Sequence, residues 1–251
     1  MSLRILVSTT GRILRQLRHD RRTVALLVVV PILLLTLLYY MFESQALPPG
    51  MPSPFDRIGL IMLGVFPFVI MFLITSVAML RERTSGTLER LLTTPLGKVD
   101  LLFGYGVAFG IAAAIQASIA ASVAYWLFDL DTAGATGLVI LIAIANAVLG
   151  VALGLFCSAF ARTEFQALQF MPVVVLPQAL LCGLFVPRDQ MAGWLEGISN
   201  ALPMSYAVEA LQEVGANAEP SGTMWRDLGI VAGCVVVALV LAAATLRRRT
   251  P

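Results

Sequence analysis

The densest group of charged and polar residues in the chain is the stretch LRERTSGTLERLLTTPLGKVD, Leu80 to Asp100, which lies between two long apolar runs. Ser85 or Gly86 can cap a short helix, Glu89 lies near the positive end of that helix, and Pro95 stops it. The pattern predicts a short charged helix outside the bilayer, with one leucine face formed by Leu88, Leu91 and Leu92.

A helix of about one and a half turns is not stable alone in water, so its leucines require a surface to pack against. Two interpretations are open at this point. The leucines pack against the protein's own spans, or they insert into a soluble partner.

Residues that could perform catalysis or bind metal are scarce. The sequence has no G-x-x-x-x-G-K-[S/T] phosphate loop, one histidine (His19), and no nucleophile with an evident base partner. Its three cysteines lie inside apolar runs, which indicates small packing residues rather than disulfides or a metal cluster. We therefore expect no enzyme activity and no cofactor on this chain.

The composition requires a membrane. Of the 251 residues, 59% are hydrophobic and 13% are charged, whereas soluble domains carry about 25% charged residues. A net charge of +2 does not suggest a nucleic-acid partner, so none is expected.

Six apolar runs are long enough to cross a bilayer, and we expect a single all-α membrane domain over residues 1–251. None of the runs contains an Asp, Glu, Lys, Arg or His, so proton- or ion-coupled transport within them is disfavoured. The runs are residues 23–42, 58–80, 101–128, 137–161, 165–186 and 228–246.

The distribution of Lys and Arg predicts the orientation. Fourteen of them lie in the N-terminal segment, the 81–98 loop, the 162–164 turn and the C-terminal tail, against three in the other connections. By the positive-inside rule, both termini and the 81–98 loop are cytoplasmic, and the chain is a multi-pass protein of the inner (cytoplasmic) membrane.

Two further segments lie outside the spans. Residues 1–22 form an amphipathic pattern, which predicts an interfacial helix whose Arg4, Arg12, Arg15 and Arg18 face the headgroups of membrane lipids; a simple basic tail is the alternative. Residues 188–227 form the long extracytoplasmic segment, with two short helices that dip back toward the bilayer. Within the spans, Gly106-x-x-x-Gly110 and Gly150-x-x-x-Gly154 permit close helix contact.

The stretch RERTSGTLERLLTTPLGKVDLLFG resembles the first cytoplasmic loop of type 2 ABC transporter permeases, in which R-E-x-x-x-G-T-L-E-x-L-L-x-T-P is typical. The later stretch GLFVPRDQMAGWLEGISNALPMSYAVEAL is similar to the segment between the fifth and sixth spans of that family. The resemblance implies a coupling helix over residues 84–96 that sits in a cleft of an ATPase subunit. Its core would be Gly86, Thr87, Leu88, Glu89, Leu91, Leu92 and Pro95.

The resemblance also implies partners. These are two copies of an ABC ATPase subunit, which bind the ATP and Mg, and a second permease copy that forms a homodimer or is a paralogue. Small size and the lack of a large outer domain look most like the drug-efflux (daunorubicin-type) branch. The expected function is ATP-driven efflux of hydrophobic or amphipathic small molecules; the alternatives are export of a lipid or lipid-linked glycan, or a non-transporting anchor or sensor.

In that family the second and fifth spans line the substrate path. The resemblance therefore assigns nine residues to the path, with core packing or lipid contact as the alternative for each. They are Phe66, Phe68, Met71, Phe72, Thr75, Gln169, Met171, Gln178 and Phe185.

Overall fold

The computed structural model describes residues 3–43, 53–85 and 98–245, and within these ranges all regular secondary structure is helical. Six of the helices are long and apolar enough to cross a membrane, which confirms the all-α membrane fold. The six are α2 (Arg21–Glu43), α3 (Pro54–Thr84), α5 (Lys98–Leu127), α6 (Thr136–Ser158), α7 (Glu164–Leu181) and α10 (Gly222–Thr245).

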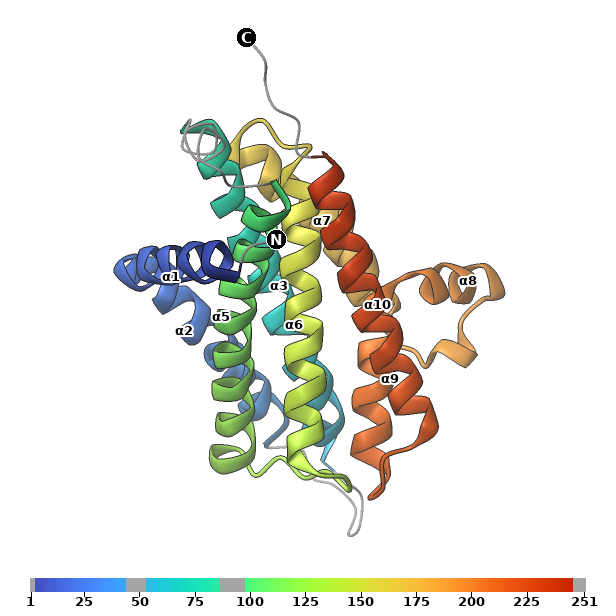
Figure 1. Cartoon of the computed structure of the whole chain (residues 1–251). Helices are drawn as coiled ribbons and strands as arrows, with labels where there is room; N and C mark the ends of the chain where they lie inside the picture. Colours follow the sequence, from blue (N-terminus) through green and yellow to red (C-terminus); the bar gives the residue numbers. More distant parts are fainter. Residues whose placement is uncertain (1–2, 44–52, 86–97, 246–251) are drawn as a thin grey trace.

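The centre of the bundle is the pair α3 and α6, which run parallel and pack backbone to backbone (Figure 1). Gly150 and Gly154 of α6 lie against the carbonyl oxygens of Phe68 and Phe72 of α3, and a Cβ on Gly154 would stand 2.6 Å from the Phe72 oxygen. Only glycine permits such an approach. The predicted contact role of this glycine pair is confirmed, and it fixes which face of α3 is buried.

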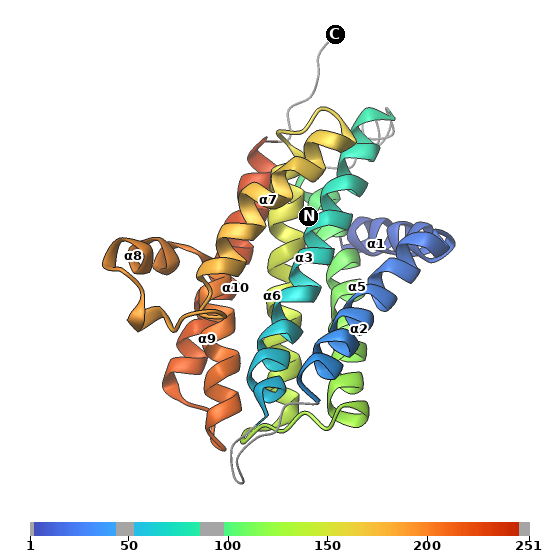
Figure 2. The same cartoon turned by 180° about the vertical axis from the view of Figure 1, so that it is seen from behind.

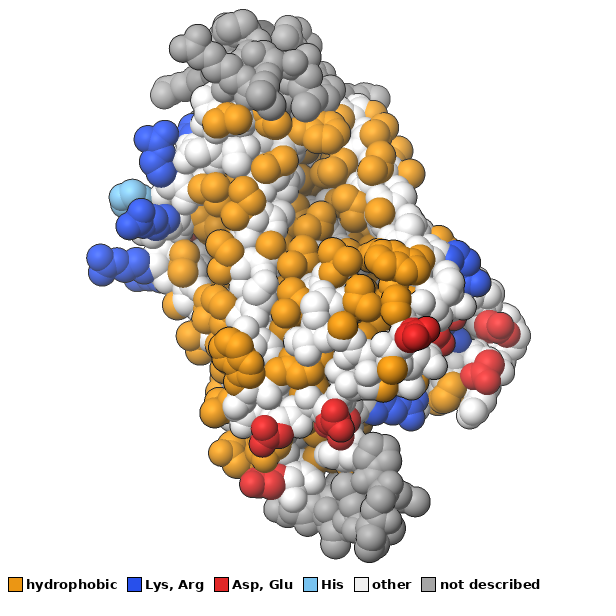
Figure 3. Space-filling model, turned by 60° about the horizontal axis from the view of Figure 1, so that its bottom comes forward, with side chains coloured by type: hydrophobic (Ala, Val, Ile, Leu, Met, Phe, Trp, Pro, Cys, Tyr) orange, Lys and Arg blue, Asp and Glu red, His pale blue; other side chains and the backbone are white. Residues whose placement is uncertain are grey.

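The outer helices α2, α7 and α10 expose most of their surface. Large apolar side chains such as Leu33 of α2, Val173 of α7 and Val237 of α10 are more than half exposed. Figure 3 shows hydrophobic side chains across the middle of one face, with Lys, Arg and His side chains at the left edge and acidic side chains, with further Lys and Arg, toward the bottom and the right. Such a surface suits lipid or another apolar protein surface rather than water.

Helix α1 (Leu3–His19) lies crosswise to the bundle near the end where α3 finishes and α5 begins, here called the α1 end (Figures 1 and 2). Its buried face is formed by Thr9, Thr10 and Ile13, whereas Val7 is exposed. The Thr10 hydroxyl donates to the Gly104 carbonyl of α5 at 3.4 Å. The expected N-terminal segment thus forms a helix, which packs on α5 through threonines as well as through apolar residues, and its place at the membrane interface stays a prediction.

The fifth span ends earlier than its apolar run. Helix α7 stops at Leu181, and Gly183 adopts a φ of +95°, which turns the chain away from the helix axis. A 3-10 turn η1 (Arg188–Gln190), α8 (Gly193–Ala201) and α9 (Pro203–Ala216) follow. Figures 1 and 2 show α8 projecting from the side of the bundle and α9 lying beside the first half of α10. These are the two short helices expected between the last two spans.

Side chains satisfy the backbone where α7 is interrupted. The Ser199 hydroxyl donates to the Leu181 carbonyl at 2.8 Å, and the Gln178 side-chain oxygen accepts from the Met204 amide at 3.3 Å. An unsatisfied backbone group in an apolar setting costs several kcal/mol. The interruption after α7 is therefore stabilised by specific hydrogen bonds.

Candidate functional site

The residues of the expected coupling helix, Gly86 to Pro95, lie outside the described residues, so their role stays a prediction. What the structure describes is the last turn of α3, which leads into them. Three consecutive residues of that turn each form a hydrogen bond to a different helix. We call this group, Arg81, Glu82 and Arg83 with their partners, the α3 junction.

The central contact of the α3 junction is an ion pair with α1. Both terminal nitrogens of Arg12 donate to one Glu82 oxygen at 3.0 Å, and Arg12 also donates to the Tyr105 hydroxyl of α5 at 3.3 Å. The Glu82 side chain is only 7% exposed, so its charge needs this partner. Hydrogen bonds to charged groups are worth about 1.5–3 kcal/mol, and the partial exposure of Arg12 places this one toward the lower end.

This contact corrects the expectation for α1. Arg12 does not face lipid headgroups with the other arginines, because its side chain is directed at Glu82. The reason is the crosswise packing of α1 on Gly104, which turns Arg12 toward the end of α3. Arg15 and Arg18 are exposed, as expected for residues that face headgroups.

The other two residues of the junction reach α7 and α6. Arg81 pairs with Glu164, the first residue of α7, at 2.7 Å, and Arg83 donates to the Ser158 carbonyl at the end of α6. Arg81 and Glu164 are both more than half exposed, so their pair contributes only about 0.2–1 kcal/mol. Together the three residues connect the segment after α3 to α1, α6 and α7.

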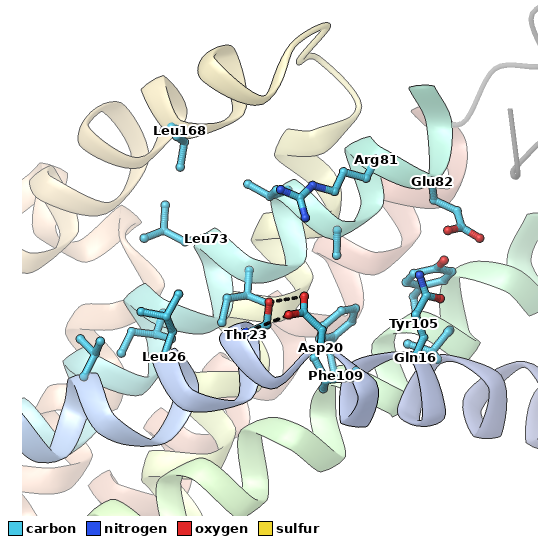
Figure 4. Close-up of a pocket in the computed structure, with 17 residues that line it drawn as sticks. Gln16, Asp20, Thr23, Leu26, Leu73, Arg81, Glu82, Tyr105, Phe109 and Leu168 are labelled. Carbon is cyan, nitrogen blue, oxygen red and sulfur yellow. Dashed lines mark hydrogen bonds between the residues drawn. The ribbon is translucent and has the colours of Figure 1, made fainter. Parts of the chain in front are cut away.

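A pocket of about 440 Å³ lies directly beside this junction, in the elbow between α1 and α2 (Figure 4). We call it the elbow pocket. One end is polar and contains Gln16, Asp20, Thr23, Arg81, Glu82 and Tyr105. The rest is apolar and is lined from α2 by Leu26 and Val30, from α3 by Ile70, Leu73, Ile74 and Val77, and from α7 by Leu168.

The mouth of the elbow pocket lies between α2 and α7. Leu26 of α2 and Leu168 of α7 line the pocket, yet they are 55% and 47% exposed. Figure 4 shows the two leucines on opposite sides of the hollow, at the end away from Glu82. Because both belong to membrane spans, the opening faces the side of the bundle.

Asp20 stands at the polar end, just before α2 begins. Its carboxylate accepts from the Thr23 amide at 3.2 Å and from the Thr23 hydroxyl at 2.6 Å, so it caps α2. These hydrogen bonds, chiefly that of the hydroxyl, hold the pKa of Asp20 below its ordinary value. Asp20 is therefore ionised at neutral pH.

Most of the expected path residues on α3 face away from this pocket. Phe68, Met71, Phe72 and Thr75 are fully buried in the core of the chain, on or beside the face that α6 covers, and Phe66 is half-buried. The pocket instead uses the neighbouring face of the same helix. The glycine pair on α6 decides this difference, because it brings α6 onto the side of α3 that carries the phenylalanines.

The expected path residues on the fifth span are spread over different surroundings. Gln169 is exposed and lines a second hollow of about 380 Å³ near the α6–α7 turn, and Met171 is half-buried. Gln178 is buried, with both ends of its amide bonded to backbone. Phe185 lies beyond the end of α7 and is 69% exposed. In the described part of the structure, these four side chains do not line a common cavity.

Sequence reasoning assigned no role to Asp20, Glu82 or Tyr105. A signal was present for the first two, because Asp20 stands three residues before Thr23 at the start of an apolar run, and Glu82 belongs to the R-E pair of the motif. Nothing in the sequence places Tyr105 beside them.

At the opposite end from α1, an ion-pair network joins η1, α9 and α10. Glu209 of α9 pairs with Arg188 and, at 3.7 Å, with Arg226, which also holds the buried Asp227 at 2.9 Å. The Arg188 guanidinium lies 5.2 Å from the centre of the Tyr206 ring. This network fixes the α8–α9 segment to the last span.

Comparison with known proteins places this architecture in a family. A family profile described as "ABC-2 type transporter" matches residues 4–214. The chain is 27% identical over 153 residues to ABC transporter G family member 20 of Dictyostelium discoideum, 61% of this chain and 21% of that protein. It is 24% identical over 167 residues to the probable multidrug ABC transporter permease YbhR of Escherichia coli K12, 66% and 45% of the two chains.

A third relative is the linearmycin resistance permease protein LnrN of Bacillus subtilis, 27% identical over 138 residues, 55% of this chain and 36% of the relative. The matched region thus spans less than half the length of each of these curated relatives. The family profile, in contrast, covers most of this chain and includes α1, the α3 junction and the spans from α2 to α7. The chain is a membrane protein that belongs to the ABC-2 type transporter family.

Proposed function

We propose that the chain is the membrane subunit of an ATP-driven exporter of hydrophobic or amphipathic small molecules, in the drug-efflux branch of its family. The observation that carries this proposal is the family match over residues 4–214, together with relatives whose names describe multidrug and linearmycin resistance permeases. An elbow pocket with one polar and one apolar end is consistent with amphipathic cargo.

The energy for transport would come from a separate ATPase subunit that binds ATP and Mg. The sequence has no phosphate loop, which supports ATP binding by a separate subunit. The expected coupling helix, residues 84–96, would enter a cleft of the ATPase. The α3 junction would then pass its displacement to α1, α6 and α7, because Arg81, Glu82 and Arg83 join them to the residues before that helix.

We further propose a complex of two permease copies and two ATPase subunits. The exposed apolar faces of α2, α7 and α10 offer surface for lipid and for a second copy. The α1 end, with both termini, would lie in the cytoplasm of a cell whose inner membrane holds the complex, as the count of fourteen to three Lys and Arg favours.

The orientation has a direct test. Cysteine at Arg18 should be protected from an impermeant thiol reagent in intact cells, and cysteine at Asn217 should react. Cys157 and Cys182 are buried, and the half-buried Cys234 is replaced by alanine in both variants to lower the background. Labelling at position 18 but not at 217 in intact cells would reverse the proposed orientation.

The coupling and the cargo are tested together in cells that express the chain with its ATPase. We expect better tolerance of at least one amphipathic or aromatic drug, and its loss in a Leu88→Asp, Leu91→Asp double variant that still reaches the membrane. Full burial of a leucine is worth about 1.5–3 kcal/mol, and a carboxylate in its place adds a desolvation cost. Arg90→Ala, off the leucine face and outside the expected core of the helix, is the matched control and should retain tolerance.

Normal drug tolerance and normal co-purification of the ATPase with the double variant would refute the coupling helix. An unchanged drug panel with an altered envelope lipid or glycan would instead favour lipid or lipid-linked glycan export by the same architecture. Failure of the chain to co-purify with any ATPase would favour a non-transporting anchor or sensor.

A further inference from the structure

The polar end of the elbow pocket carries a net negative charge, which Arg81 offsets only in part. Three ionised residues line it, and two already have partners, because Arg81 pairs with Glu164 and Glu82 pairs with Arg12. Asp20 takes part in none of the ion pairs found among the described residues. The balance at this end is therefore one net negative charge.

The carboxylate of Asp20 is held in place by hydrogen bonds, and its oxygens can still accept further hydrogen bonds from a ligand. Each of its oxygens accepts one hydrogen bond from Thr23, and a carboxylate oxygen has two lone pairs. Arg21 and Arg22 follow directly but are exposed, and neither pairs with Asp20 in the described part of the chain. Figure 4 shows the carboxylate directed into the hollow between α2 and α3, below Arg81.

The other end of the pocket suits an apolar body. Leu26 and Val30 of α2 face Leu73 and Ile74 of α3 across it, and Leu168 of α7 borders the mouth. The volume of about 440 Å³ lies within the range of about 300–1,000 Å³ that is usual for small-molecule sites. A molecule that enters from the side between α2 and α7 would reach Asp20 with its far end.

We infer that the elbow pocket binds an amphipathic cation, with an ammonium group at Asp20 and its apolar body between α2 and α3. The inference rests on the proposed function, in which such a molecule is the cargo. An anionic amphipath would bring a second negative charge to the carboxylate and is disfavoured at Asp20, because Arg81 already pairs with Glu164. A drug-like amine and the amine of a lipid headgroup share the required chemistry.

The test uses the full chain in nanodiscs of phosphatidylglycerol and two fluorescent probes of nearly equal shape. Dansylcadaverine carries an ammonium group, and its N-acetyl derivative is uncharged. Dansyl fluorescence rises in an apolar site, and empty nanodiscs give the background. We expect Asp20→Asn to weaken dansylcadaverine binding about tenfold and to leave the acetylated probe unchanged. Asparagine retains an acceptor for the Thr23 amide, so α2 keeps its cap.

Two further variants serve as a control for the change of charge and as a test of where the probes bind. Asp189→Asn makes the same change at an exposed residue far from the pocket and should leave both probes unaffected. Leu73→Trp fills the apolar part and should weaken both probes. Equal loss of both probes in Asp20→Asn, or no loss of either, would overturn the inference. So would unchanged binding in Leu73→Trp.

A lipid arm identifies the source of the ammonium group. If half of the phosphatidylglycerol is replaced by phosphatidylethanolamine, the lower surface charge weakens binding of the cationic probe to both proteins. A larger loss in the wild-type chain than in Asp20→Asn shows that the lipid amine occupies the site, and an equal loss in both points to a drug-like amine. The proposed function is judged separately: if the Asp20 test fails while the pair still exports drugs, only this inference fails. Normal coupling in the Leu88→Asp, Leu91→Asp variant would refute the coupling mechanism and leave the binding result intact.

Discussion

The substitution Gly154→Ala tests the contact on which the bundle is centred. A Cβ at this position would stand 2.6 Å from the Phe72 carbonyl oxygen, and ordinary van der Waals contact begins at 3.4 Å. The obstacle is backbone rather than a flexible side chain, so it cannot rotate away. Helices α3 and α6 must therefore separate locally by about 0.8 Å, the difference between these two distances.

The expected cost follows from that displacement. A gap of about 0.5–1 Å removes a quarter to a half of the dispersion energy of each contact that is opened. Overpacking of this kind costs about 1–3 kcal/mol, and alanine recovers up to about 1 kcal/mol through its better helix propensity. We expect a net loss of about 1–2 kcal/mol of unfolding free energy for Gly154→Ala, and a larger loss when Gly150→Ala is added.

The assay is thermal unfolding of the purified chain in detergent, followed by size-exclusion recovery of the monodisperse protein. Gly137→Ala, in the first turn of the same helix, is the matched control because nothing lies within 4 Å of its Cβ position. The control should be neutral or slightly stabilising. If Gly154→Ala unfolds at the same temperature as Gly137→Ala, the backbone contact between α3 and α6 does not exist.

Three other perturbations have defined outcomes. Arg12→Ala should leave Glu82 without its partner and increase amide hydrogen exchange in α1. Arg15→Ala, at an exposed position, should not increase it. Equal exchange in both variants would contradict the α3 junction. Among the described residues, neither end of the buried Gln116 amide finds a hydrogen-bond partner, so Gln116→Met should maintain or raise the unfolding temperature by removing a cost of about 1–3 kcal/mol; a clear drop would show that the amide has a partner. Because the pKa of Asp20 is lowered, the cap on α2 should contribute constant stability above about pH 5 and lose it only as the pH falls through that lowered pKa. Wild type and Asp20→Ala, which removes both acceptor oxygens, should therefore differ equally at pH 8 and pH 6, and a difference that disappears in that window would contradict the cap.

The number and type of the spans could be predicted because length and apolarity are properties of a local segment. The end of the fifth span could not, because it depends on the backbone angle of Gly183, which an apolar run does not reveal. For that reason Phe185 was expected on a span and lies beyond it.

The direction of each helix face was harder to predict. A helix that is apolar on all sides has no polar face to identify the buried one, so Phe68 and Phe72 could not be distinguished from Leu73 by pattern. The glycine pattern shows that a contact is possible but not what it meets. Gly110, in the same kind of motif as Gly154, has only an ordinary contact of 3.8 Å to Val148.

Charged residues outside the spans were predicted by number rather than by partner. The amphipathic pattern indicated an interfacial α1, but the pairing of Arg12 with Glu82 depends on how α1 crosses α5, which no local pattern fixes. Asp20 likewise acquires its place in the elbow pocket only when α2, α3 and α7 are assembled.

The interruption between α7 and α9 bears on the order in which the chain is completed during synthesis. With 18 residues and two prolines, α7 is the shortest and least apolar of the six spans, so it gains the least from entering hydrocarbon alone. The groups that satisfy its far end, Ser199 and the Met204 amide, are made after it. We therefore expect α7 to reach its final position only once α8 and α9 have left the ribosome, after the first four spans have been made.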